Sequence, residues 1–206
     1  IEGKFRELEL QPGNGISYQL LYDLFQDSLS AVSLTVNGQE MQPNKDYSVS
    51  VSAAAEGNWN IGEVYFTGAG ALDTTRLDVK NKWVVTGEIG FSQLRLKIAQ
   101  LQRRDAKGII LVSRSFPRLT PFALKGGMDI RSHDRNNNFP YVTVSYATLS
   151  RMLNKPALDS AALAVLGKTT YKTNIAFALA KTEVRSTSSN VLGVLEGGDK
   201  KDEYVF

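Results

Sequence analysis

The stretch from Trp83 to Val112 constrains the fold more than any other part of the sequence, because it predicts a strand, a helix and a second strand in succession. Trp83 to Thr86 is a run of aromatic and β-branched residues, which is typical of a strand. Ile109 to Val112 is an uninterrupted apolar run, which is typical of a strand buried on both faces. Between them, apolar residues recur at steps of three and four and therefore share one face of a helix: Phe91, Leu94, Ile98 and Leu101.

The ends of this helix and the pairing of its two strands follow from local chemistry. The Ser92 hydroxyl can accept a hydrogen bond from an orphan backbone N–H, so we expect Ser92 to cap the helix. Gly108 is placed to end it in the left-handed conformation. Two strands joined by a helix of this length usually pair in parallel through a right-handed crossover. Six residues are expected in the core: Phe91, Leu94, Ile98, Leu101, Ile110 and Val112.

The N-terminal region has an irregular pattern. Lys4 to Leu10 alternates as a strand would, whereas Tyr18 to Leu29 has apolar residues at positions 20, 21, 24 and 25 and fits a helix. Asn37-Gly38 follows the β-branched run that ends at Val36, and this dipeptide predicts a tight hairpin. Further strands are predicted over residues 48–52 and 62–68, with a loop over residues 53–60 between them.

The second half of the chain begins with an irregular segment over residues 113–138. A strand is then predicted at Phe139–Val144, followed by a helix capped by Ser145 and a short helix at Asp159–Leu166. Lys172 to Arg185 alternates as a returning strand, and two more strands are expected at residues 190–198 and 202–206. Many short strands with few helices predict an α+β fold, a β-sandwich or partly open barrel that contains the strand-helix-strand unit.

Composition excludes several classes of function. The 24 basic and 21 acidic residues are interspersed and leave a formal net charge of +3, which does not fit a nucleic-acid partner. The sequence has 0 cysteines, which excludes disulfides, thiol catalysis and cysteine-ligated metals. No apolar run approaches the roughly 20 residues that span a bilayer. The chain starts at Ile1 with no visible signal peptide, so we expect an excised or processed form.

The sequence predicts no catalytic, cofactor-binding or metal-binding residues. His133 is the only histidine, and it has no nucleophile motif beside it. The polar loop around it contains Arg131, Asp134 and Arg135. These four residues are interpreted first as a solvated loop and second as a loop that contacts a partner. The acidic residues near the C-terminus fit a solvated turn rather than a metal site: Glu196, Asp199, Asp202 and Glu203.

Four segments resemble protease-associated domains in the order in which that family has them. GEVYFTG, Gly62 to Gly68, is similar to the family's opening strand. Two further segments are similar to those on either side of the family's helix: LDVKNKWVV, Leu77 to Val85, and DAKGIILVS, Asp105 to Ser113. NFPYVTVSYATLSRML, Asn138 to Leu153, is similar to its "xPxVxVSxxxGxxLL" segment. The resemblance implies a protease-associated domain over residues 48–185.

Two flanking segments resemble bacterial aminopeptidases that carry an inserted protease-associated domain. SLTVNGQEMQPNKDYSV, Ser33 to Val49, is similar to their lead-in, which here covers residues 1–47. NVLGVLEGGDKKDEYVF, Asn190 to Phe206, resembles the start of the catalytic domain in co-catalytic zinc aminopeptidases. Residues 186–206 would then be a linker and the first strands of that domain. In this family the zinc motif GAHxDH follows immediately, so the resemblance places catalysis and zinc after Phe206.

The resemblance implies a non-catalytic module of a secreted or periplasmic zinc aminopeptidase, which shapes substrate access or contacts proteins and peptides. Its expected partners are its own catalytic domain, a peptide or protein substrate, and a second copy bound through the C-terminal strands. The alternative is a free-standing binding or receptor-like module of the same fold with no peptidase domain. The C-terminal segment favours the first interpretation, because a free-standing module has no reason to end with the opening strands of a peptidase.

Overall fold

The computed structural model describes residues 1–52, 54–68, 78–87, 89–131 and 139–198, except for the side chains of Phe91 and Ser92. The chain divides into two compact units. Unit 1 comprises Ile1–Gln26, Met128–Ser132 and Val184–Phe206, and unit 2 comprises Asp27–Gly127 and His133–Glu183. The strands β2, β8 and β10 each have residues in both units.

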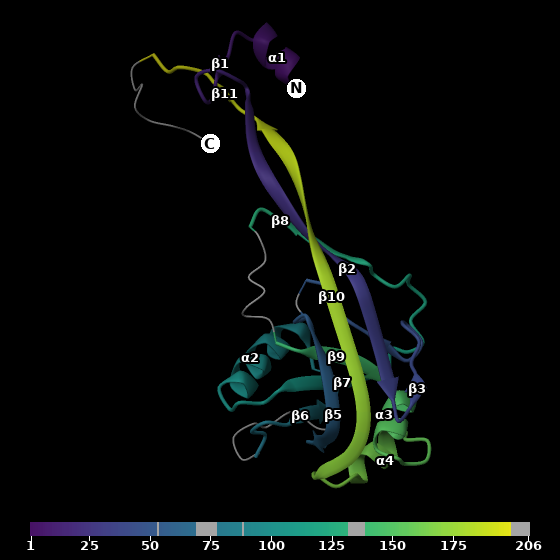
Figure 1. Ribbon diagram of the computed structural model, residues 1–206. Coiled ribbons are helices and arrows are strands. Elements are labelled where there is room, and N and C mark those ends of the chain that lie inside the picture. The colour runs from purple at the N-terminus through teal and green to yellow at the C-terminus, as the bar shows by residue number, and fades with distance from the viewer. Residues whose placement is uncertain (53, 69–77, 88, 132–138, 199–206) are drawn as a thin grey trace. The chain divides into compact units, whose positions relative to one another are not determined.

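A nine-stranded open sheet organises unit 2, with strand order β3-β2-β10-β5-β6-β7-β9-β4 and β8 paired to β2. Figure 1 shows the central strands of this sheet beside the helices α2, α3 and α4. The strands are β2 (Gln19–Val36), β3 (Gln39–Glu40), β4 (Tyr47–Ser48), β5 (Gly57–Phe66), β6 (Trp83–Thr86), β7 (Gly108–Ser113), β8 (Lys125–Asp129), β9 (Tyr141–Ser145) and β10 (Thr170–Val191). The helices are α2 (Phe91–Gln102), α3 (Tyr146–Met152) and α4 (Ser160–Val165).

The centre of the sheet is parallel and its flanks are antiparallel. β5, β6, β7 and β9 run in one direction, with Val64 opposite Trp83, Trp83 opposite Gly108 and Ile109 opposite Tyr141. β10 pairs antiparallel to β5, and β4 pairs antiparallel to β9. The predicted strand-helix-strand unit is confirmed as β6-α2-β7, with its two strands parallel.

The core of unit 2 lies around these parallel strands. Four of the six residues predicted to lie in the core are buried: Leu94, Leu101, Ile110 and Val112. Ile98 is partly buried and packs against the core. The sixth expected core residue is Phe91, whose side chain lies outside the described residues. All six residues of β7 are buried, which fits a strand covered on both faces.

Both predicted ends of α2 are wrong. The helix begins at Phe91 with Gly90 as its N-cap, so Ser92 lies inside the first turn. It ends after Gln102, and the left-handed conformation is taken by Asp105, with φ of 57°. Aspartate tolerates this conformation because its short polar side chain can bond locally. Gly108 instead begins β7, where the Trp83 ring lies against its backbone.

The largest corrections concern the N-terminal region. Residues 2–7 form the helix α1 (Glu2–Glu7), although residues 4–10 alternate as a strand would. Residues 18–29 were predicted as a helix, but Gln19 to Val36 is the strand β2. Its neighbours β10 and β8 supply partners for its backbone groups, and this long-range pairing overrides the helical spacing.

The predictions for the shorter elements are confirmed in part. The hairpin at Asn37-Gly38 joins β2 to β3, with both turn residues at positive φ. The Ser145 hydroxyl accepts from the Thr148 N–H at 3.1 Å and caps α3, and the Asp159 carboxylate caps α4. The strand predicted at residues 48–52 is reduced to Tyr47–Ser48, and the loop predicted at residues 53–60 contains the start of β5.

Two segments predicted as irregular contain strand. β8 lies within the segment 113–138, and β10 continues through residues 186–189, whose polar composition suggested a linker. The strand expected at residues 202–206 lies outside the described residues. The strand-rich α+β class predicted from the sequence is confirmed. Among the described residues, no helix is long and apolar enough to cross a membrane.

Unit 1 is small and contains the ends of β2, β8 and β10 that lie outside unit 2. It also has α1 and the short strands β1 (Gln11–Pro12) and β11 (Gly193–Val194), which pair antiparallel. Tyr18 lies at its centre, with the Phe5 ring edge-on at 6.3 Å and the Arg6 guanidinium over its ring at 5.4 Å. The Leu192 N–H donates to the Tyr18 carbonyl at 2.7 Å, which ties the C-terminal segment to this cluster.

Candidate functional site

A cavity of about 300 Å³ opens at the carboxyl ends of the four parallel strands of unit 2. Phe66 is the last residue of β5, Gly87 directly follows β6, Arg114 directly follows β7, and Tyr146 directly follows β9. In open sheets with parallel strands, ligands bind outside the carboxyl ends of the strands. The seven lining residues are Phe66, Gly87, Val112, Arg114, Tyr146, Ser160 and Leu163.

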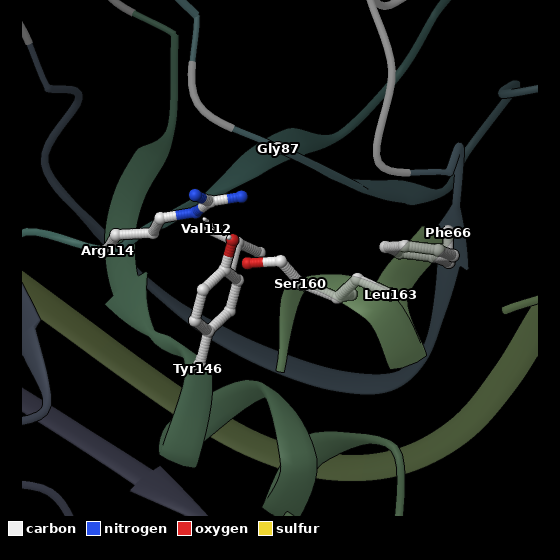
Figure 2. Close-up of a pocket in the computed structure, with 7 residues that line it drawn as sticks. All are labelled: Phe66, Gly87, Val112, Arg114, Tyr146, Ser160 and Leu163. Carbon is white, nitrogen blue, oxygen red and sulfur yellow. Dashed lines mark hydrogen bonds between the residues drawn. The ribbon is translucent and has the colours of Figure 1, made fainter. Parts of the chain in front are cut away.

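Three polar groups meet in this cavity. The Arg114 Nε donates to the Tyr146 hydroxyl at 3.1 Å. Figure 2 shows the Arg114 guanidinium, the Tyr146 hydroxyl and the Ser160 hydroxyl pointing toward one another. Arg114 is exposed, whereas Tyr146 and Ser160 are half-buried, so the polar groups lie where solvent still reaches them.

The opposite part of the cavity is apolar. The side chains of Phe66, Val112 and Leu163 are buried, with exposed fractions of 1%, 2% and 3%. Leu163 and Ser160 both come from α4, whose first turn is fixed by the bond from the Ala162 N–H to the Asp159 Oδ1 at 2.8 Å. α3 packs on β7 and β9 and so positions Tyr146 over the strand ends.

The lining side chains supply one permanent cation, two hydroxyls and an apolar wall. Among the seven described lining residues, Tyr146 is the one whose side chain is of a type that transfers protons in general acid–base catalysis. Across the described ranges, no three His, Cys, Asp or Glu residues are grouped closely enough to hold a metal ion.

A second cavity of about 270 Å³ in unit 2 is lined from β4, β7, β9 and α2. Its polar side chains include Ser48, Ser50, Ser113 and Arg118. Tyr141 also lines it, and burial raises the pKa of the Tyr141 hydroxyl, an effect that a hydrogen bond with Ser50 partly offsets. The protonated hydroxyl therefore remains a fixed part of this wall at neutral pH.

Unit 1 carries a different candidate site, an apolar surface. Among the described residues of unit 1, Tyr18 is the only apolar one whose side chain is buried. The large apolar side chains of unit 1 that are exposed, which we call the unit 1 apolar surface, are Ile1, Leu8, Ile16, Leu20, Leu21, Met128, Ile130, Val184, Leu192 and Leu195. The much larger unit 2 exposes four such residues in its described part: Leu96, Leu119, Leu124 and Val165.

The loop predicted to contact a partner is described only at Arg131. This residue is exposed, and its N–H donates to the Asp129 Oδ1 at 3.0 Å. His133, Asp134 and Arg135 lie outside the described residues, so their contact role stays a prediction.

The cavity residues were missed by the sequence analysis, although a signal existed. Three of the lining residues follow the end of a predicted strand by one or two positions: Gly87, Arg114 and Tyr146. Parallel strands bring their carboxyl ends to the same edge of a sheet, so polar residues at these positions are expected to meet. The sequence alone could not identify Ser160, which depends on how α4 packs.

No family model and no curated protein matches the sequence. One similar solved structure is the crystal structure of a Peptidase M28 precursor from Shewanella amazonensis SB2B. The match has 13% sequence identity and a TM-score of 0.42, and it covers 97% of this chain and 44% of that chain. The chain thus spans less than half the length of this neighbour.

Proposed function

We propose that this chain is the non-catalytic protease-associated module of a secreted or periplasmic zinc aminopeptidase. In this proposal it shapes access of peptide substrates to a catalytic domain that the chain itself does not contain. Zinc is bound in that catalytic domain. The observation that carries the proposal is the unit 1 apolar surface, which a partner that covers it would remove from water.

The physical argument starts from the cost of exposing apolar side chains to water, about 25 cal/mol for each Å². Monomeric soluble proteins rarely expose large contiguous apolar patches, and such patches usually mark interfaces. Unit 1 buries only Tyr18 among its described apolar residues and leaves the unit 1 apolar surface open. A part this small with so little core is expected to be stable only against another surface.

The C-terminal segment indicates which partner covers this surface. Leu192 and Leu195 belong to the unit 1 apolar surface, with exposed fractions of 41% and 80%. They also lie within Asn190–Phe206, the segment that resembles the opening of a zinc aminopeptidase catalytic domain. The surface is therefore continuous along the chain with that domain, which would cover it without a separate binding event.

Hydrogen exchange on this chain, with and without the catalytic domain fused after Phe206, tests the proposal. We expect amides of residues 184–195 to exchange faster in the chain alone and to become protected in the fusion. Leu21→Ser and Ile130→Ser should lower binding of a hydrophobic fluorescent dye by the chain alone. Leu96→Ser is the matched control, because Leu96 is 67% exposed but lies in unit 2.

Two results would contradict the proposal. One is an exchange pattern in residues 184–195 that the fusion leaves unchanged, which would favour the free-standing binding module. The other is zinc-dependent hydrolysis of an aminoacyl chromogenic substrate by the chain alone, persisting in the His133→Ala variant. We expect no such hydrolysis with or without added zinc, since the sequence offers one histidine and no cysteine for a two-zinc site.

A further inference from the structure

We propose that the amino-terminal half of β5 binds an extended peptide, which pairs with the open edge of this strand beside the start of β6. A cavity of about 430 Å³ lies along this edge, and we call it the β5 groove. Residues 58–63 of β5 line it together with Asn81, Trp83 and Lys107. All of these residues belong to unit 2, so the inference goes beyond the proposed function and holds with or without a catalytic domain.

The open edge follows from the register of the sheet. β10 pairs with β5 as far as Gly57, whereas β6 joins β5 only at Val64, opposite Trp83. Residues 57–63 therefore have a strand on one edge and no strand of the described chain on the other. Neighbouring side chains of a strand point to opposite faces of a sheet, so a cavity lined by six consecutive residues runs along the edge rather than over one face.

The end of β5 shows which backbone groups face the groove. The Phe66 N–H donates to the Thr169 carbonyl on the β10 side at 2.9 Å, and the Thr67 N–H donates to the Val85 carbonyl on the β6 side at 3.0 Å. Successive residues of a strand direct their N–H groups to alternate edges, so the odd-numbered residues of β5 direct theirs to the β6 side. Three N–H groups of the overhanging part therefore face the groove: those of Trp59, Ile61 and Glu63.

These backbone groups favour a peptide as the ligand. Within the described part of the chain, no acceptor pairs with the three N–H groups. The carbonyl groups of Trp59 and Ile61 face the same way and likewise have no donor in that part of the chain. Unpaired backbone groups are costly unless water or a ligand satisfies them. An extended peptide carries donors and acceptors at the spacing of a strand, which is the basis of strand addition to a sheet edge.

The side chains around the groove suit a neutral ligand that carries an apolar group. Among the described lining residues, Glu63 and Lys107 are the charged ones, and their opposite signs select neither an anion nor a cation. The Trp59 and Trp83 rings lie edge-on with centroids 5.8 Å apart and supply an apolar wall. A volume of about 430 Å³ is in the range of small-molecule sites, which suits a short peptide segment better than the edge of a folded second copy.

Tryptophan fluorescence of the whole chain tests the inference, because the sequence has 2 tryptophans and both line the groove. The probe is N-acetyl-Lys-Thr-Val-Thr-Val-Thr-Lys-amide, whose β-branched residues favour an extended conformation. Its titration should change the emission of the chain until the groove is saturated.

Two versions of the probe, methylated on backbone nitrogen, show whether its N–H groups pair with β5. One version is methylated at both valines and the other at two of the threonines. Since valines and threonines direct their N–H groups to opposite edges, only one version blocks the edge that faces β5. We expect that version to bind roughly tenfold or more weakly than the unmethylated probe, and the other to change much less.

Substitutions at Glu63 assign the binding to the strand edge. Glu63→Pro removes the N–H that faces the groove, and proline is tolerated in a strand where this N–H has no partner strand. It should weaken binding of the probe roughly tenfold. Glu63→Ala is the matched control, because it removes the charge and keeps the N–H, and it should bind the probe as the wild type does. The methylated probes are titrated into the unaltered chain, so they carry the test if Glu63→Pro fails to fold.

Three outcomes would overturn the inference. They are an emission that the probe leaves unchanged at millimolar concentration, equal binding of the two methylated versions, and an equal effect of the two Glu63 substitutions. Displacement of the probe by maltotriose would also reject it, in favour of a saccharide on the tryptophan rings. A dimer in sedimentation that Glu63→Pro abolishes would assign the edge to a second copy instead. These results are independent of hydrogen exchange in residues 184–195, so failure here leaves the test of the proposed function intact.

Discussion

Lys181 and Asp27 form an ion pair in unit 2 in which both side chains are fully buried. The Lys181 Nζ lies 3.0 Å from the Asp27 Oδ2 and also donates to the Val51 carbonyl at 2.9 Å. The Lys181 N–H donates to the Glu56 Oε1 at 2.7 Å. Asp27 lies on β2 and Lys181 on the neighbouring β10, so the pair favours one register of these two long strands. Register specification is the best-attested role of buried polar groups.

Replacing Lys181 with Met should lower the free energy of unfolding by about 3–5 kcal/mol, because the Asp27 carboxylate stays buried without its lysine partner. The double variant Asp27→Leu/Lys181→Met should recover most of this loss, since no charge remains buried. Urea denaturation measures both changes. A single variant that loses less than about 1 kcal/mol would show that the pair does not stabilise unit 2.

The same two strands provide a control for this prediction. Arg185 on β10 and Asp23 on β2 form an ion pair at 2.5 Å in unit 1, but the Arg185 side chain is 67% exposed. The hydrogen bond from Arg185 lowers the pKa of Asp23. Water screens exposed pairs, so Arg185→Met should change stability little compared with Lys181→Met.

Tyr47 should make stability depend on pH in the alkaline range. Burial, and then the negative charge of Glu40, raise the pKa of Tyr47 from its ordinary value near 10 to about 12. The folded state therefore holds the phenol proton more tightly than the unfolded state. This contribution to stability is complete below about pH 10 and is lost as the pH rises toward about 12.

Difference titration of the wild type against Tyr47→Phe, followed by tyrosinate absorbance, should give a midpoint near pH 12 for the missing group. The Tyr47→Phe variant should also lose less stability than the wild type between about pH 10 and pH 12. A midpoint near 10 would contradict the burial of this hydroxyl, since an exposed tyrosine titrates there.

At the scale of elements, the pairing of β6 with β7 depends on a glycine. Gly108 lies opposite Trp83, and a Cβ added at Gly108 would sit 2.6 Å from the indole ring. Gly108→Ala must therefore move a ring that is 3% exposed and that packs edge-on against Trp59 and Phe177. We expect a loss of about 1–3 kcal/mol, typical of overpacking a core.

Gly62→Ala is the control for this substitution. Gly62 also lies in a strand of the same sheet, but nothing lies within 4 Å of a Cβ added there. Denaturant melts of the two variants should therefore differ by at least about 1 kcal/mol. Equal stability of the two variants would show that the Trp83 ring is not held in place.

The elements also show where sequence patterns succeed. The Asn37-Gly38 hairpin and the Ser145 cap were predicted because their bonds join residues close in sequence. The helix predicted over residues 18–29 is wrong. Apolar residues at positions 20, 21, 24 and 25 fit either a helix or a strand, and only the neighbouring segments of the fold decide between the two. The pairing of β2 with β10 decided that case.

At the scale of the whole molecule, the two units should respond differently to truncation. Deleting residues 190–206 removes β11 and the bond from the Leu192 N–H to the Tyr18 carbonyl, which both belong to unit 1. Unit 2 keeps its own core, so its melting temperature should shift by less than about 2–4 °C. We also expect weaker self-association, since the deleted strands offer an edge for a second copy.

Calorimetry and analytical ultracentrifugation of the truncated chain measure these two effects. The full chain at matched concentration is the reference. Unfolding of unit 2 on truncation would show that residues 190–206 are an integral part of that fold. Unchanged association would show that the C-terminal segment does not pair with a second copy.

The sequence by itself determined the features that depend on neighbours along the chain. Local signals predicted β6-α2-β7, β9, α3 and α4, and with them the strand-rich α+β class. These signals are the β-branched runs, the three- and four-residue apolar spacing, the hairpin and the Ser145 cap. The resemblance to protease-associated domains added an expectation of function. The candidate cavity was only half predictable, since the sequence places Gly87, Arg114 and Tyr146 after strands.

The tertiary structure decided everything that depends on partners far apart in the sequence. It made β2 a strand, extended β10 through polar residues 186–189, and buried Lys181 because Asp27 lies beside it. It also brought Ser160 to Arg114 and left the unit 1 apolar surface exposed. The physical reason is that backbone pairing, burial and charge compensation are set by contacts between distant segments, which local spacing does not encode.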